Sequence, residues 1–116
     1  MLQTRNELNQ NLLHLCGIYG ARDCLLYIVK FGLVNANEKD TKEEYPIELL
    51  MKNHSENTKR NKEMFLWLSR ISDMQKENKE GIKLANLMNE WQKEIYESYL
   101  KKPFLQRKYI ITTETA

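Results

Sequence analysis

The first third of the chain repeats its large apolar residues at helical spacing. Leu12, Leu15 and Tyr19 stand three and four positions apart, which is the pattern of one stripe on an amphipathic helix. The side chain of Asn11 can accept a hydrogen bond from a free backbone N–H at the helix start, and Gly20 can end the helix in left-handed dihedrals. The sequence therefore predicts a short helix between these two residues.

A second helix is predicted from about Asp23 to Gly32, because an acidic residue favours a helix start and a glycine favours its end. The short break between the two helices predicts an antiparallel pair. Residues 33–44 are rich in charge and predict an exposed connection. Pro46 then predicts the start of a third helix, since proline in the first turn loses no hydrogen bond.

The second half predicts a polar loop followed by a helix over residues 64–71, which are rich in large apolar side chains. Ser72 and Gln75 have the spacing of a capping box, which predicts one long helix over about residues 73–101. A start after Gly81 is the alternative. The apolar stripe of this helix consists of Leu84, Leu87, Met88, Trp91, Ile95 and Tyr99.

These elements make the predicted fold all-α, with a single domain over residues 1–102 and a tail over residues 103–116. Only four Gly and two Pro occur in 116 residues, so tight-turn signals are too sparse for a sandwich or barrel of many strands. Hydrophobic residues make up 41% of the chain, which is enough for a modest core.

Charge and hydropathy narrow the expected partners. The formal net charge is +2 and the basic residues are interspersed with acidic ones, so we expect no nucleic-acid partner. No apolar run approaches the roughly 18 residues that span a bilayer, so we expect no membrane partner. The chain does not open with a basic-then-apolar signal pattern, and Cys16 and Cys24 are too few for a disulfide framework. We therefore expect a protein of the cytoplasm or nucleus.

No combination of residues predicts catalysis. The sequence has no nucleophile elbow and no glycine-rich phosphate loop, so we expect neither an enzyme nor a cofactor site. His14, Cys16, Cys24 and His54 have the residue types of a zinc site, but their spacing lacks the close cysteine pair of zinc-binding patterns, so we expect no metal. The two cysteines are interpreted as buried apolar residues. A disulfide between them requires suitable geometry.

An internal repeat gives the most specific signal. Residues 12–15 (Leu-Leu-His-Leu) and 46–49 (Pro-Ile-Glu-Leu) lie 34 positions apart, and each set opens a helix pair. They resemble the ankyrin repeat, whose signature is T-P-L-H-x-A at a period of about 33. Residues 34–36 (Val-Asn-Ala) also resemble the V-N-A of that family. The departures include Gly17, where the family usually has alanine, and Asn53, where glycine is expected.

The resemblance implies a stack of helix pairs, with repeats over about residues 11–44 and 45–71. It places His14 at a structural position, where the ring bonds loop backbone. It also implies a non-enzymatic module that binds another protein, as an adaptor, scaffold or inhibitor. Such stacks usually need at least three units, so we expect the helix over about residues 73–101 to cap the stack.

Three alternatives stay open. The Tyr-Pro pair at Pro46 and the segment 96–99 (Tyr-Glu-Ser-Tyr) more weakly resemble the short ankyrin regions of B-cell adaptor and scaffold proteins. A host-manipulating viral or bacterial ankyrin protein fits the same repeat. A helical oligomerisation domain is the third alternative, in which the C-terminal helix pairs between copies through the stripe Leu84–Trp91–Ile95 and makes a homo-oligomer.

The residues predicted to contact a partner protein lie at two places. One group stands at the turn between the first two helices, and the other stands in the charged connection before Pro46. We expect shape and charge to carry the specificity of these contacts. The predicted contact residues are Tyr19, Arg22, Lys39, Asp40, Lys42 and Glu43.

Overall fold

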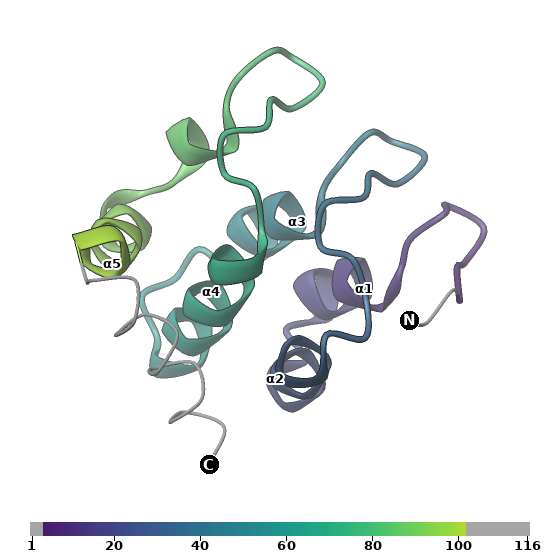
Figure 1. Ribbon diagram of the computed structural model, residues 1–116, viewed down its shortest axis with the longest axis horizontal. Helices are drawn as coiled ribbons and strands as arrows, with labels where there is room; N and C mark the ends of the chain where they lie inside the picture. Colours follow the sequence, from purple (N-terminus) through teal and green to yellow (C-terminus); the bar gives the residue numbers. More distant parts are fainter. Residues whose placement is uncertain (1–3, 102–116) are drawn as a thin grey trace.

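The computed structural model describes residues 4–101, which form five α-helices, one 3-10 helix and no strand. α1 packs beside α3, and α2 packs beside α4, which in turn contacts α5 (Figure 1). The predicted all-α fold is confirmed for these residues, whereas the predicted tail over residues 103–116 lies outside them. The elements are α1 (Leu12–Tyr19), α2 (Arg22–Phe31), α3 (Pro46–Asn53), α4 (Lys59–Ile71), η1 (Leu84–Leu87) and α5 (Glu90–Lys101).

The first three helices begin and end where local signals predict. The side chain of Asn11 accepts from the backbone N–H of His14 at 3.0 Å, and the His14 ring Nδ1 accepts from the backbone N–H of Asn11 at 3.1 Å. This reciprocal pair is a capping box. Gly20 and Gly32 end α1 and α2 with φ values of 65° and 59°, a conformation that costs glycine little. Pro46 is the first residue of α3.

Three short loops share one hydrogen-bond pattern and project from the same side of the helices (Figure 1). They are loop 1 (residues 6–10), loop 2 (residues 40–44) and loop 3 (residues 78–82). In each loop the side-chain oxygen of the first residue accepts from the backbone N–H groups two and four positions later. In each, the first N–H also donates to the fifth carbonyl. The sequence predicts two repeats, yet this loop occurs three times among residues 4–101.

α4 starts earlier than predicted. The hydroxyl of Thr58 accepts from the backbone N–H of Asn61 at 3.1 Å and so caps the helix, which makes residues 59–63 helical despite their polarity. These polar residues form the first turns of a helix whose apolar residues come later. The predicted loop therefore ends at Thr58.

The predicted long helix over residues 73–101 is wrong over residues 73–89. Ser72 is the C-cap of α4, and its hydroxyl donates to the carbonyl of Leu68 at 2.6 Å, so it caps no following helix. The backbone N–H of Gln75 bonds the side chain of Asp73 instead of Ser72. Loop 3 and η1 occupy this segment.

α5 begins at a capping box that the sequence analysis missed. Asn89 and Gln92 each donate a backbone N–H to the side-chain oxygen of the other, at 2.9 and 3.1 Å. The Asn89 amide and the Trp91 indole also donate to one backbone carbonyl, that of Ser55, at 3.1 and 2.8 Å. Trp91 packs edge-on against Phe65 of α4 with ring centroids 5.9 Å apart. These contacts fix the start of α5 to α4 and to the loop before it.

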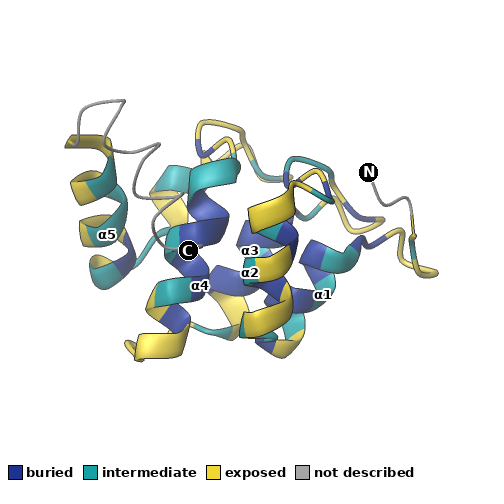
Figure 2. Ribbon diagram, turned by 60° about the horizontal axis from the view of Figure 1, so that its bottom comes forward, coloured by how far each residue is buried: buried dark blue, intermediate teal, exposed yellow. Residues whose placement is uncertain are grey.

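The buried core contains residues of α1, α2, α3 and α4 and of the segments that connect the helices (Figure 2). α1 approaches the backbone of α3 closely at Gly17, where a Cβ atom would lie 2.9 Å from the carbonyl oxygen of Pro46 and 3.1 Å from the nitrogen of Leu50. The glycine therefore permits a contact that alanine would obstruct. Fully buried side chains include Leu13, Leu25, Ile47, Leu50, Met64, Phe65, Leu68 and Leu84.

Candidate functional site

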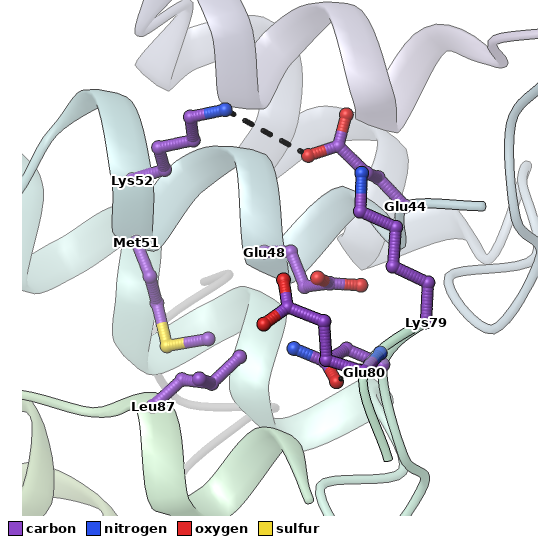
Figure 3. Close-up of a pocket in the computed structure, with 8 residues that line it drawn as sticks. Glu44, Glu48, Met51, Lys52, Lys79, Glu80 and Leu87 are labelled. Carbon is purple, nitrogen blue, oxygen red and sulfur yellow. Dashed lines mark hydrogen bonds and ion pairs between the residues drawn. The ribbon is translucent and has the colours of Figure 1, made fainter. Parts of the chain in front are cut away.

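A groove of about 330 Å³ lies between α3, loop 3 and η1. Figure 3 shows that α3 and loop 3 each contribute acidic and basic side chains to the groove. Met51 and Leu87 lie at one end of it. Met51 belongs to α3, and Leu87 ends η1, so the groove exists only because the segment after α4 folds back beside α3. The lining residues are Glu44, Glu48, Met51, Lys52, Asn78, Lys79, Glu80 and Leu87.

Glu48 has the most perturbed environment of the carboxylates in the groove. Burial raises its pKa, and the nearby Glu44 and Asp40 carboxylates raise it further. The backbone N–H of Tyr45, which donates to Glu48 Oε1 at 2.9 Å, acts in the opposite direction. The Lys52 ammonium lies 3.9 Å from Glu44 Oε2. Glu44 thus has a cation beside it, whereas Glu48 is held by one backbone bond.

The lining of the groove combines charged and apolar side chains. Three carboxylates and two ammonium groups line it, so its net charge is negative. Met51 is 7% exposed and Leu87 is 37% exposed, so an apolar side chain finds a contact surface beside the charges. No Ser, Cys or His is among the lining residues, and a nucleophile of those types is therefore missing beside Glu48.

The groove opens where a contact present in the first unit is not repeated. His14 stands four positions after loop 1, and its Nε2 lies 2.9 Å from the carbonyl oxygen of Glu44, at the end of loop 2. This contact closes the first seam, which we define as the junction of α1 with loop 2. Glu48 stands four positions after loop 2, and its carboxyl group accepts from the backbone N–H of Tyr45 instead of reaching loop 3. The second seam, between α3 and loop 3, contains the groove.

His14 is therefore structural in the way that the sequence analysis predicted. It is 0% exposed, and its ring bonds the backbone of Asn11 and faces the Glu44 carbonyl. Burial lowers the pKa of the ring, and the Glu44 carbonyl and the Asp40 carboxylate partly offset this. A buried neutral imidazole with both nitrogens engaged is not available to a ligand.

Four of the predicted contact residues lie in loop 2 or directly before it, and three of these four are exposed. Lys42 and Glu43 are exposed on the loop, and the Lys39 ammonium lies 5.5 Å from the ring centroid of Tyr45. Asp40 differs from these three residues, because it is 5% exposed and its carboxylate accepts from the backbone N–H groups two and four positions later and from Gln10. Its role is to shape the loop.

The other two predicted contact residues lie away from the groove. Tyr19 is 75% exposed at the end of α1. Arg22 forms ion pairs with Glu63 and with Asp23 and lines a separate groove of about 300 Å³ between α2 and α4. None of the six predicted contact residues lines the groove beside α3.

The two cysteines differ in environment. Cys16 is buried, which raises the pKa of its thiol to about 12, with the neighbouring Cys24 contributing. Cys24 is exposed, so the prediction of a buried residue is wrong there. His54 Nε2 lies 3.1 Å from the carbonyl oxygen of Ile18. Within residues 4–101 no group of three or more His, Cys, Asp or Glu side chains is placed to hold a metal ion.

No family model, curated protein or solved structure matches this chain. Among the described residues no helix has the length and apolar character needed to cross a membrane. The function must therefore be argued from the groove and loops. Sequence reasoning missed Glu48 and Glu80, because only the return of loop 3 places them in one groove. The repeated loop pattern at Asn6, Asp40 and Asn78 was the signal that could have indicated that return.

Proposed function

We propose that this chain is an ankyrin-type module that binds another protein and has no enzymatic activity of its own. The groove between α3 and loop 3 is the observation that carries the proposal. It lies beside projecting loops whose tips are exposed and charged, as at Lys42 and Glu43. A concave surface next to adjustable loops suits recognition of an extended segment of a partner protein.

The repeated architecture supports this proposal. The same loop precedes α1, α3 and η1, and the helix pair of the first unit packs directly on that of the second. α5 carries the apolar residues Trp91 and Ile95 against α4, so we assign it the role of closing the stack. Three stacked units meet the usual minimum for a stable repeat domain.

The chemistry of the groove defines the segment that fits it. Glu48 and Glu80 face the groove from α3 and loop 3 and attract a Lys or Arg side chain of the partner (Figure 3). Met51 and Leu87 offer contact to a neighbouring apolar side chain. We therefore propose a partner segment in which a basic residue stands next to an apolar one.

Selection from a library of displayed random peptides tests the proposal. The intact chain should recover peptides that share a basic residue next to an apolar residue. Glu80→Lys should weaken the binding of those peptides at least about tenfold, a loss expected when a charge pair is reversed. Glu94→Lys makes the same charge change at an exposed residue on α5 and is the matched control.

Two outcomes contradict the groove as the site. One is recovery of no peptide that binds the intact chain more tightly than the Glu80→Lys variant. The other is equal weakening by Glu94→Lys, which would indicate a long-range charge effect without a specific contact. A comparison of Lys39→Glu and Lys42→Glu then shows whether the tip of loop 2 contributes, as the sequence predicts.

A further inference from the structure

Loops 1 and 2 are joined by a backbone hydrogen bond that loops 2 and 3 do not repeat. The N–H of Thr41, the second residue of loop 2, donates to the carbonyl of Leu8, the third residue of loop 1, at 2.8 Å. Lys79 and Lys42 hold the equivalent positions one unit later. Among residues 4–101 the Lys79 N–H and the Lys42 carbonyl form no backbone hydrogen bond. The second seam therefore leaves one backbone donor and one backbone acceptor unused within this part of the chain.

The side chains that differ between the two units explain why the second seam stays open. Beside the first seam, the amide of Gln10 donates to Asp40 Oδ2 at 3.2 Å. His14 adds its contact with loop 2. One unit later these two side chains are replaced by Glu44 and Glu48, whose carboxyl groups find their partners within their own unit. The second seam thus lacks the donors that draw loops 1 and 2 together, and it gains negative charge.

The shared shape of the loops gives the direction of the unused donor. In loops 2 and 3 the fourth N–H donates to the first carbonyl, at 2.9 and 3.0 Å, and the fourth residue has a positive φ. Because the Thr41 N–H points from this turn to the preceding loop, the Lys79 N–H of the same turn points across the second seam toward loop 2. Lys79 also lines the groove (Figure 3).

We propose that the partner segment binds the groove in an extended conformation and that one of its backbone carbonyls accepts from the Lys79 N–H, as the Leu8 carbonyl accepts from Thr41. This contact rests on the proposed function, because it belongs to the same groove and the same partner. Extended segments commonly bind through such main-chain hydrogen bonds, while pockets select their side chains. Glu44 and Glu80 disfavour an anionic acceptor beside Lys79, so a neutral carbonyl suits this donor.

Proline at position 79 tests the donor. Residue 79 is the second residue of a hydrogen-bonded turn, a position that favours proline, so Lys79→Pro removes the N–H and keeps the turn. Lys79→Ala removes the same charge, keeps the N–H and is the matched control. The probe is the tightest-binding peptide recovered by the display selection. Isothermal titration calorimetry should show that Lys79→Pro binds it about fivefold or more weakly than Lys79→Ala, the loss expected for one hydrogen bond.

The same substitution in loop 2 provides a second comparison, which needs no peptide. Thr41→Pro should melt about 4 °C or more below Thr41→Ala, because it breaks the bond to Leu8. Lys79→Pro should melt at or above Lys79→Ala, because its N–H has no bond to lose. A loss at position 79 as large as that at position 41 would show that the donor is already used, and it overturns the proposal. Circular dichroism checks that each variant folds.

Amide hydrogen exchange follows both donors in the intact chain. Without peptide, the Thr41 amide should exchange slowly and the Lys79 amide quickly, and saturating peptide should slow Lys79 about tenfold or more. Slow exchange at Lys79 without peptide overturns the proposal, because another segment of the chain or a second copy then occupies the donor.

The binding data separate this inference from the proposed function. Equal affinity of Lys79→Pro and Lys79→Ala for the peptide overturns the backbone contact. If Glu80→Lys still weakens that peptide, the groove remains the binding site and only the backbone contact is wrong. Recovery of no specific peptide overturns both.

Discussion

The two seams of the molecule begin alike and end differently. In the first seam the buried imidazole of His14 reaches the Glu44 carbonyl of loop 2, and Gly17 lets α1 approach α3 closely. In the second seam Glu48 occupies the position of His14, η1 replaces a full helix, and a groove of about 330 Å³ lies between α3 and loop 3. The comparison teaches that a repeated junction is packed where an imidazole reaches the next loop, and open where a carboxyl group and a short 3-10 turn stand in the equivalent places.

Truncation of the buried imidazole should give the largest effect. His14→Ala removes a fully buried side chain, the cap of Asn11 and the contact with the Glu44 carbonyl, and we expect a loss of about 3 kcal/mol in the free energy of unfolding. Asn86 stands at the corresponding position after loop 3 and is exposed, so Asn86→Ala should cost less than about 0.5 kcal/mol. Urea unfolding of both variants checks this. Equal losses would contradict the structural role assigned to His14.

The two seams should respond to pH in opposite directions, with a smaller effect than truncation. The pKa of His14 lies below its ordinary value of 6.5 in the folded chain, so His14 contributes stability at higher pH that is lost as the pH falls below 6.5. The pKa of Glu48 lies above its ordinary value of 4.5, so its contribution is present below 4.5 and is lost as the pH rises above it.

Single substitutions separate these two contributions. The free energy of unfolding is measured between about pH 4 and about pH 8, a range that covers both groups. His14→Gln should lose less stability in acid than the parent chain. Glu48→Gln should lose less stability than the parent between acidic and neutral pH. Parallel pH profiles for the parent chain and both variants would contradict the assignment of the pH dependence of stability to His14 and Glu48.

Substitution of Gly81, the fourth residue of loop 3, should have a smaller effect on the free energy of unfolding. This residue has a φ of 79°, and a Cβ atom there would meet open space, so only the backbone conformation opposes substitution. Gly81→Ala should therefore lower the free energy of unfolding by about 1 kcal/mol. Thermal unfolding checks the value, with Gly32→Ala as a comparison, because its φ of 59° and open surroundings predict a similar loss.

The smallest effect is expected at the same position of loop 2. Glu43 has a φ of 60°, a conformation that is unfavourable for a residue with a side chain. Glu43→Gly should raise the free energy of unfolding by about 0.5 kcal/mol, because the relieved strain exceeds the added entropy of the unfolded chain. Differential scanning calorimetry checks the sign. A lower melting temperature would show that the loop carries no strain at this position.

Local signals explain what the sequence could predict. Asn11, Gly20, Gly32 and Pro46 act through their own side chains or dihedrals, so the ends of α1, α2 and the start of α3 follow from nearest neighbours. The same reasoning placed the exposed residues Lys42 and Glu43 in a connecting loop. Spacing alone failed where tertiary contacts decide the conformation.

The segment before α5 shows that failure clearly. Leu84 and Leu87 have helical spacing, but they form a single 3-10 turn. The residues before them belong to loop 3, and Asn89 caps a new helix after them. Neither signal was weak, since Asn78 opens a loop like that at Asp40, and Asn89 and Gln92 make a capping box. The groove was missed for the same reason, since its loop 3 side depends on this return of the chain.

The hydrogen bonds to the Ser55 carbonyl make tryptophan fluorescence a measure of whether α5 is attached. The Trp91 indole N–H bonds that oxygen at 2.8 Å, whereas Trp67 is 5% exposed on α4. Detachment of α5 would transfer the Trp91 indole to water and shift its emission to the red. Trp67 would stay in an apolar environment until α4 itself separates from the core. Emission from Trp67→Phe and Trp91→Phe variants therefore resolves the release of one helix from the loss of the whole core.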